Sequence, residues 1–226
     1  MSDTGVTPWR AMTVVVKALT GAFIVAYGLF FIAPETMKLQ AEVLLSVIPA
    51  RFDAASQYRF EAWYEPFGEV LGHVFLHAGP FHLLMNVIAF LQAAPLVAQR
   101  LSVARFLTLF FVSAAGGALL FVALHGGADP SVRMVGASGG ICGVFAAYFL
   151  AVRPTWRHAL ADPLVRNAIG MFLVINVGLA GVAQAMGWLP IAWDAHLGGF
   201  IVGGLAYLVL APRWRGGGPW GDHARP

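Results

Sequence analysis

Charged residues are scarce in this chain. They make up 11% of its 226 residues, whereas soluble domains give about a quarter of their residues to charge. The single cysteine, Cys142, excludes an intramolecular disulfide and therefore a small disulfide-stapled scaffold. The net charge of +3 comes without any basic tract, so nucleic acid is not an expected partner. Neither internal repeats nor low-complexity segments interrupt the sequence.

Apolar residues, in contrast, are abundant. They form 59% of the chain, and the mean hydropathy is +0.74. A membrane helix needs about 20 mostly apolar residues, and six segments approach that length, the fourth being the shortest: Thr13 to Ala33, Pro80 to Ala98, Val103 to His125, Ser138 to Val152, Leu164 to Gly187 and Trp193 to Ala211. Their irregular spacing and lack of polar alternation exclude a membrane β-barrel.

The sequence therefore predicts an all-α polytopic membrane protein in which residues 13–211 form one six-helix bundle. The first span is too long for the apolar region of a signal peptide and is expected to be retained. Residues 1–12 would form an amino-terminal tail, and residues 212–226 a disordered carboxyl-terminal tail rich in glycine, proline and arginine.

The distribution of charge predicts the orientation. Basic residues collect on the cytoplasmic side of membrane proteins, and alternating the six spans puts ten of the 14 basic residues on the side shared by both tails: Arg10, Lys17, Arg100, Arg105, Arg153, Arg157, Arg166, Arg213, Arg215 and Arg225. Both termini are therefore expected in the cytoplasm, in an inner membrane of bacterial type. The long first loop, residues 34–79, would face outward and carry short amphipathic helices.

Polar side chains within spans are functional candidates because lipid disfavours them. The second span opens HAGPFHLLMN, where His82 and Asn86 lie one turn apart on the same face. The alternative interpretation is that this pair forms hydrogen bonds between helices. His73 and His77 precede the span and are expected in the interface, with His77 in a structural role.

The fourth and sixth spans begin with small residues around a serine and a histidine. Ser138 lies within VGASGGICG, where it either caps the helix or faces a site with free backbone N–H groups. His196 lies within WDAHLGGFIVGG, whose Gly199 and Gly203 form a GxxxG face. If that face packs against the glycines of the fourth span, Ser138 and His196 reach a similar depth.

Such a meeting would create a nucleophile and its base. An imidazole is suited to take the proton of a serine, and His82, Asn86 and the N–H groups of Ala137 and Ser138 would donate to the oxyanion. Asp194 lies two residues before His196 and would point away from it, so it is expected to be an N-cap or an interface charge. The arrangement is thus a dyad, not a triad.

These motifs resemble the rhomboid family of intramembrane serine proteases. The resemblance runs from about Glu69 to Ala211 and rests on FLHAGPFHLLMN, GASGGICG and AHLGGFIVG in the family's order. It implies that Ser138 is the nucleophile, His196 the base, and His82, Asn86 and nearby backbone N–H groups the oxyanion donors. It also implies transmembrane protein substrates, no metal or cofactor, a lateral gate formed by the fifth span, and a cap formed by residues 188–193.

Two positions depart from the family pattern. Cys142 stands where many members carry an aromatic residue that stacks on the catalytic histidine, so we expect slower turnover or altered substrate choice. We interpret it as a buried packing residue, not a second nucleophile. The Trp-Arg pair of the family's first loop is also missing, which leaves the anchoring of that loop open.

Two other functions fit parts of the sequence. A catalytically silent relative would bind or escort membrane segments, but such a protein needs neither Ser138 nor His196. A transporter or channel would use the polar groups as a pathway, but these groups cluster at one membrane face. Asn176 in the fifth span is either a packing residue or a substrate contact.

Overall fold

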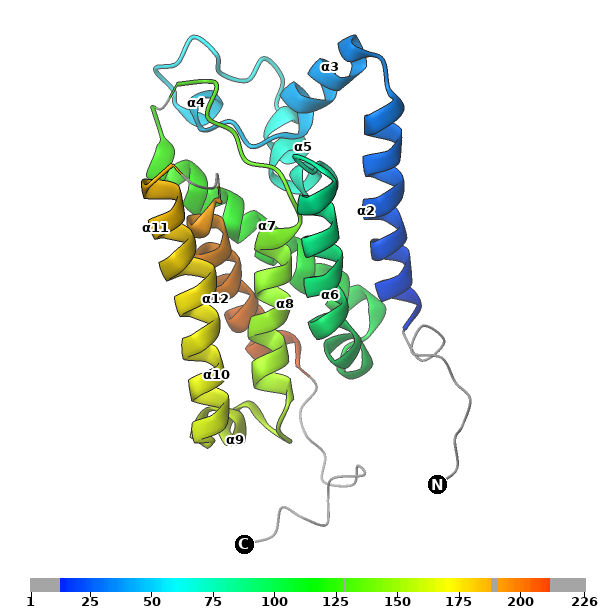
Figure 1. The fold of residues 1–226 in the computed structure, drawn as a ribbon, viewed down its shortest axis with the longest axis vertical. Coiled ribbons are helices and arrows are strands. Elements are labelled where there is room, and N and C mark those ends of the chain that lie inside the picture. The colour runs from blue at the N-terminus through cyan, green and yellow to red at the C-terminus, as the bar shows by residue number, and fades with distance from the viewer. Residues whose placement is uncertain (1–12, 128, 188–190, 212–226) are drawn as a thin grey trace, which may run out of the picture.

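The computed structural model describes residues 13–127, 129–187 and 191–211, and the regular structure within these ranges is helical (Figure 1). The predicted tails, 1–12 and 212–226, and half of the predicted cap loop, residues 188–190, lie outside the described residues. The elements are α2 (Val14–Ile32), α3 (Glu35–Leu45), α4 (Pro49–Phe52), α5 (Glu65–Gly72), η1 (His73–Phe75), α6 (Pro80–Arg100), α7 (Val103–His125), α8 (Ser138–Ala151), α9 (Trp156–Ala161), α10 (Pro163–Leu173), η2 (Val174–Leu179), α11 (Ala180–Ala185) and α12 (Trp193–Leu210).

The six predicted spans are confirmed as helices. Five helical segments are long and apolar enough to cross a membrane: α2, α6, α7, the continuous run α10–η2–α11, and α12. The sixth, α8, has only 14 residues, a length of about 21 Å at 1.5 Å per residue. The protein is therefore an integral, multi-pass membrane protein, as predicted.

Helix α8 can be short because protein surrounds it. It packs against α6, α7 and α12, and nearly all of its residues are buried. A helix enclosed in this way does not have to match the thickness of the lipid, so its first residue can lie below the membrane surface.

Two ends of the bundle differ in character. The helices α3, α4 and α5 gather at one end, which we call the loop end, whereas α9 lies at the opposite end (Figure 1). At this second end Ser102 caps α7 and Asp162 caps α10, each by accepting a backbone N–H bond. Arg153 also pairs with Asp162, so the chain between α8 and α10 is fixed.

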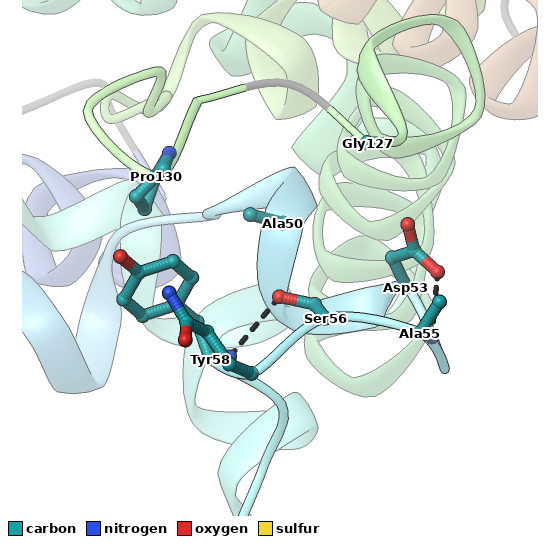
Figure 2. A pocket seen from close by; sticks show the side chains of 8 residues that line it. Ala50, Asp53, Ala55, Ser56, Tyr58, Gly127 and Pro130 are labelled. Atoms are coloured by element: carbon teal, nitrogen blue, oxygen red, sulfur yellow. Dashed lines mark hydrogen bonds between the residues drawn. The ribbon is translucent and has the colours of Figure 1, made fainter.

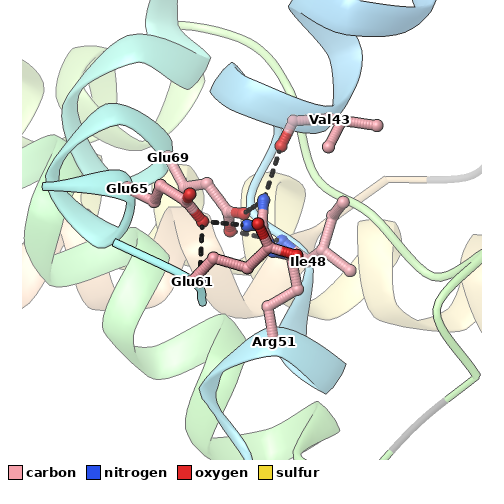
Figure 3. Close-up of polar contacts among 6 residues, drawn as sticks. All are labelled: Val43, Ile48, Arg51, Glu61, Glu65 and Glu69. Carbon is pink, nitrogen blue, oxygen red and sulfur yellow. Dashed lines mark hydrogen bonds and ion pairs between the residues drawn. The ribbon is translucent and has the colours of Figure 1, made fainter. Parts of the chain in front are cut away.

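The first loop is anchored by a part-buried ion-pair cluster in place of the missing Trp-Arg pair (Figure 3). Arg51 of α4 pairs with Glu65 and Glu69, which lie one turn apart on α5. Glu69 is fully buried and also accepts a hydrogen bond from the backbone N–H of Ile48 at 3.0 Å. The guanidinium also lies over the ring of Phe60, 4.6 Å from its centroid.

The same loop is tied to the segment that leads into α8. Val47 and Met134 form an antiparallel bridge with N···O distances of 3.0 and 2.9 Å. Arg133 pairs with Glu42 of α3 at 2.6 Å. The expected short helices of the first loop are therefore present, and they brace the connection that ends at Ser138.

Candidate active site

Ser138 is the first residue of α8. The first four N–H groups of a helix have no intrahelical acceptor, and the first backbone bond into this helix is from Ile141 N–H to the carbonyl of Ala137. The N–H groups of Ala137 and Ser138 thus lie at the positive end of the helix. No side-chain cap bond satisfies them among the described residues, so the capping alternative for Ser138 is wrong.

Gly136 brings His82 close to this helix start. Its φ of +115° suits glycine, and a Cβ atom there would lie 2.8 Å from Nε2 of His82. The backbone N–H of Gly136 also donates to the carbonyl of His73 at 2.9 Å. The imidazole of His82 therefore fills the space that the missing side chain leaves beside Ala137.

The hydrogen bond at the other nitrogen of His82 sets its tautomer. The backbone N–H of Ala78 donates to Nδ1 of His82 at 3.3 Å. A neutral imidazole that accepts at Nδ1 carries its proton on Nε2. The nitrogen facing Gly136 is consequently a hydrogen-bond donor.

Asn86 lies one turn further along α6 and is buried. Its Nδ2 donates to the carbonyl of His82 at 2.9 Å, and its Oδ1 has no partner among the described residues. The side-chain bonds of His82 and Asn86 thus stay within their own segment. The alternative in which this pair links two helices by hydrogen bonds is wrong.

His196 carries the opposite tautomer. Its Nδ1 lies 3.1 Å from the carbonyl oxygen of Asn176. A carbonyl only accepts, so Nδ1 bears the proton and Nε2 of the neutral ring keeps a lone pair. His196 is thus arranged as a proton acceptor at Nε2.

The glycine faces of α8 and α12 pack as predicted. A Cβ atom on Gly199 would lie 2.0 Å from the carbonyl oxygen of Gly139, and one on Gly203 would lie 2.2 Å from Cα of Gly143. Only glycines allow backbones to approach so closely. The close approach fixes the relative depth of the two helices.

This packing brings the neighbours of Ser138 and His196 together. A Cβ atom on Gly139 would lie 3.3 Å from the carbonyl oxygen of Ala195. Within the described residues no hydrogen bond joins the Ser138 hydroxyl to His196. Ser138 and His196 each follow or precede a residue of this contact, one on α8 and one on α12, and their side chains share no proton in this structure.

His73 and His77 are buried within the protein, at 1% and 4% exposure. Desolvation lowers the pKa of His73 to about 4. Burial, followed by the nearness of the titratable ring of His82, lowers the pKa of His77 to about 4 as well. Both rings are therefore neutral at pH 7. His73 accepts the N–H of Gly136 on its carbonyl, which is a structural role beside the site.

Asp194 is not the N-cap of α12, so that one of the two alternatives drawn from the sequence is wrong. Ala192 is the N-cap residue of α12, and Asp194 is fully buried with Oδ2 2.7 Å from Nε2 of His125. Asn176 also has an unexpected place. Its side chain bonds to Phe172 in its own helix, while its backbone carbonyl reaches His196.

Neither the ion-pair anchor of Arg51 nor the carbonyl contact of Asn176 was predicted. The spacing of Glu65 and Glu69 by one turn was a visible signal for a cation partner. A backbone carbonyl, in contrast, leaves no trace in the residue type. Cys142 is buried, as expected for a packing residue.

A separate cavity lies between the first loop and residues Gly127 and Pro130 (Figure 2). Its lining includes Asp53 and Ser56, whose oxygens accept backbone N–H bonds from Ala55 and Tyr58. These are local turn bonds, and the lining contains neither Ser138 nor His196. Over the part of the chain that the structure describes, no cluster of three His, Cys, Asp or Glu side chains is placed to hold a metal ion.

The fold and the site together define a helical multi-pass membrane protein with a serine at an enclosed helix start and two histidines beside it. A family model for the rhomboid domain matches residues 62–213. The chain belongs to the rhomboid family.

Curated relatives carry the family's name. The chain is 32% identical over 154 residues to rhomboid-like protease 5 of Toxoplasma gondii, covering 65% of this chain and 17% of that protein. It is 30% identical over 141 residues to RHOMBOID-like protein 1 of Arabidopsis thaliana, covering 62% and 33%. It is 28% identical over 167 residues to rhomboid-related protein 1 of Caenorhabditis elegans, covering 72% and 44%. The chain thus spans less than half the length of each.

Proposed function

We propose that this protein is an intramembrane serine protease that hydrolyses peptide bonds in or near the transmembrane segments of other membrane proteins. The observation that carries the proposal is the pair of opposite tautomers beside the start of α8. Backbone groups make His82 a donor and His196 an acceptor at Nε2. An oxyanion needs the first, and a serine nucleophile needs the second.

The reaction follows from these assignments. Nε2 of His196 takes the proton of the Ser138 hydroxyl as its oxygen attacks the peptide carbonyl carbon. The oxyanion receives hydrogen bonds from Nε2–H of His82, from Asn86 and from the N–H groups of Ala137 and Ser138. His196 then gives its proton to the leaving nitrogen, and water, activated by the same ring, hydrolyses the acyl-enzyme.

The short helix α8 explains how such a reaction takes place in a membrane. A helix of 14 residues is about 9 Å shorter than a hydrocarbon core of about 30 Å. The nucleophile at its first residue then lies below the level of the loop end. We propose that the loop end faces outward and that both termini are cytoplasmic, as the distribution of basic residues indicates.

The decisive experiment labels the full chain, reconstituted in lipid, with a fluorescent fluorophosphonate. We expect labelling of the wild type and none of Ser138→Ala or His196→Ala. Ser131→Ala is the matched control, because Ser131 is an exposed serine in the same connection, and it should label like the wild type. The wild type and Ser131→Ala should also cleave a reconstituted membrane protein, whereas Ser138→Ala and His196→Ala should not.

The outcome separates the proposal from the non-catalytic alternative. His82→Ala and Asn86→Ala should fold, label slowly and lower kcat by about 10²-fold, the usual effect of an oxyanion donor. A well-folded wild type that binds membrane segments but neither labels nor cleaves would be an escort protein. That result would overturn the proposal.

A further inference from the structure

The fifth span contains one turn of unusual geometry. Residues Val174–Leu179 form a π-helical turn between α10 and α11. Such a turn holds one extra residue and changes which carbonyls find a partner within the helix, and it is frequent at functional sites. Here Nδ2 of Asn176 donates to the carbonyl of Phe172 at 3.0 Å. The side chain thus satisfies a carbonyl at the entry to the widened turn.

The backbone carbonyl of Asn176 makes a contact outside its own helix. It lies 3.1 Å from Nδ1 of His196. The ring of Phe172, one turn before Asn176, stacks on that of Phe200, one turn after His196, with centroids 5.3 Å apart. Both contacts join the same part of the fifth span to the same part of α12. The π-helical turn therefore packs against α12 at the level of the proposed base.

The rest of the fifth span is loosely held. Only 6% of its most apolar stretch of 18 residues is buried inside the protein, against 28% or more for the same length of the other four long spans. Gly170 and Gly178 face open space. Contacts at the π-helical turn are therefore a large part of what fixes this span beside His196.

We infer that Asn176 is a positioning residue for the base. Its side chain stabilises the π-helical turn, and its backbone carbonyl holds the proton of His196 on Nδ1, so that Nε2 points its lone pair toward Ser138. This is the orienting task that an aspartate performs in a Ser-His-Asp triad. The catalytic consequence of this inference rests on the proposed function. The tautomer of His196 does not depend on that function, because it follows from the contact with Asn176.

Asp194 does not compete for this task. Its two carboxylate oxygens are used by His125 and by the backbone N–H of Ala195. Because Asp194 is engaged elsewhere, the carbonyl of Asn176 is the hydrogen-bond partner of His196 Nδ1 among the described residues. Orientation of the base therefore depends on a helix other than its own.

The test measures the tautomer of His196 directly. Nitrogen-15 NMR of the full-length protein labelled at histidine, in lipid, distinguishes protonated from unprotonated ring nitrogens, and His196→Gln identifies the signals. The neutral ring of the wild type should carry its proton on Nδ1. A ring protonated mainly on Nε2 would overturn the inference, and this measurement requires no variant of Asn176 to fold.

Two substitutions then test the role of the side chain. Asn176→Ala removes the donor to Phe172, whereas Asn176→Ser keeps one, because a serine hydroxyl can bond to the carbonyl four residues earlier. We expect Asn176→Ala to give a mixture of tautomers and a kcat about tenfold lower with little change in KM. Asn176→Ser should restore both.

The outcomes are distinct from those for the proposed function. If Asn176→Ala folds and keeps a single Nδ1–H tautomer with an unchanged kcat, the positioning role is wrong while the protease survives. If the wild type has the Nδ1–H tautomer, and the two variants change it as expected, but fluorophosphonate does not react with Ser138, the proposed function fails and the positioning of the ring stands.

Discussion

Nε2 of His125, at the end of α7, lies 2.7 Å from Oδ2 of Asp194, in the first turn of α12. The carboxylate is fully buried, and the imidazole is partly exposed. Phe121, one turn before His125, packs its ring at 4.6 Å from that imidazole. This pair fastens the start of α12, and so fixes the helix turn that carries His196.

Breaking this pair should be costly. His125→Ala leaves a buried carboxylate without its partner, and we expect the stability of the folded protein to fall by about 3 kcal/mol. Thermal unfolding in detergent measures the loss. The double variant His125→Ala/Asp194→Asn removes the unpaired charge and should recover part of it. Equal stability of the single and double variants would contradict the role of His125 as the partner of a buried carboxylate.

The α8–α12 contact gives a test with a neighbouring control. Gly203→Ala places a methyl group 2.2 Å from Cα of Gly143, where only backbone movement can make room, whereas Gly204→Ala meets Cβ of Ala146 at an ordinary 3.6 Å. We expect Gly203→Ala to lose about 2 kcal/mol or more and most labelling of Ser138. Gly204→Ala should match the wild type or exceed it slightly.

Equal behaviour of these two alanine variants would show that the glycine face does not set the helix separation. Intact stability of Gly203→Ala with lost labelling would instead show that the contact serves geometry alone. Thermal unfolding and fluorophosphonate labelling on the same samples distinguish these cases.

The anchor of the first loop should respond to pH. Burial, opposed by the N–H of Ile48 and by Arg51, raises the pKa of Glu69 from 4.5 to about 7. A carboxyl that holds its proton more tightly when folded contributes stability that is full below about pH 4.5 and lost as the pH rises through 7. Relative to Glu69→Gln, the wild type should therefore lose about 3 kcal/mol between pH 4.5 and 8.

Unfolding curves of both proteins across that range provide the measurement. Val70→Ala is the control, because it changes the same helix without changing a titratable group, and its difference from the wild type should not vary with pH. Parallel curves for the wild type and Glu69→Gln would contradict the raised pKa.

Cys142 offers a test of how the base is braced. It is buried on α8, one turn after Ser138, and is too small to support a ring. We predict that Cys142→Tyr raises kcat or changes substrate choice, at a stability cost of about 1–3 kcal/mol from overpacking. Cys142→Ala should leave kcat unchanged. Wild-type kinetics on several substrates for Cys142→Tyr would argue against the prediction.

The helices could be predicted from sequence because lipid imposes a simple rule. Long apolar segments must form helices that satisfy their own backbone, so the span from Val103 to His125 was predicted to the residue. The packing of Gly199 on Gly139 was also predictable, since small residues four apart favour close helix contacts. In both cases the signal lies in residue type and spacing.

Other features escaped prediction because they depend on contacts between distant parts of the chain. The burial of His73 and His77 is one such feature: the ring of Phe23 in α2 lies 6.1 Å from that of His77. Asp194 was left with two alternatives because its partner, His125, is 69 residues away. No local pattern indicates either arrangement.

The sequence by itself determined the membrane helices, the glycine faces and the positions of the serine and the histidines, since apolar length and residue spacing are properties of the chain. Only the tertiary structure decided which way each imidazole holds its proton. That choice depends on the N–H of Ala78 and the carbonyl of Asn176. Every residue carries a backbone carbonyl, and every residue but proline carries a backbone N–H, so folding alone brings these two groups into place.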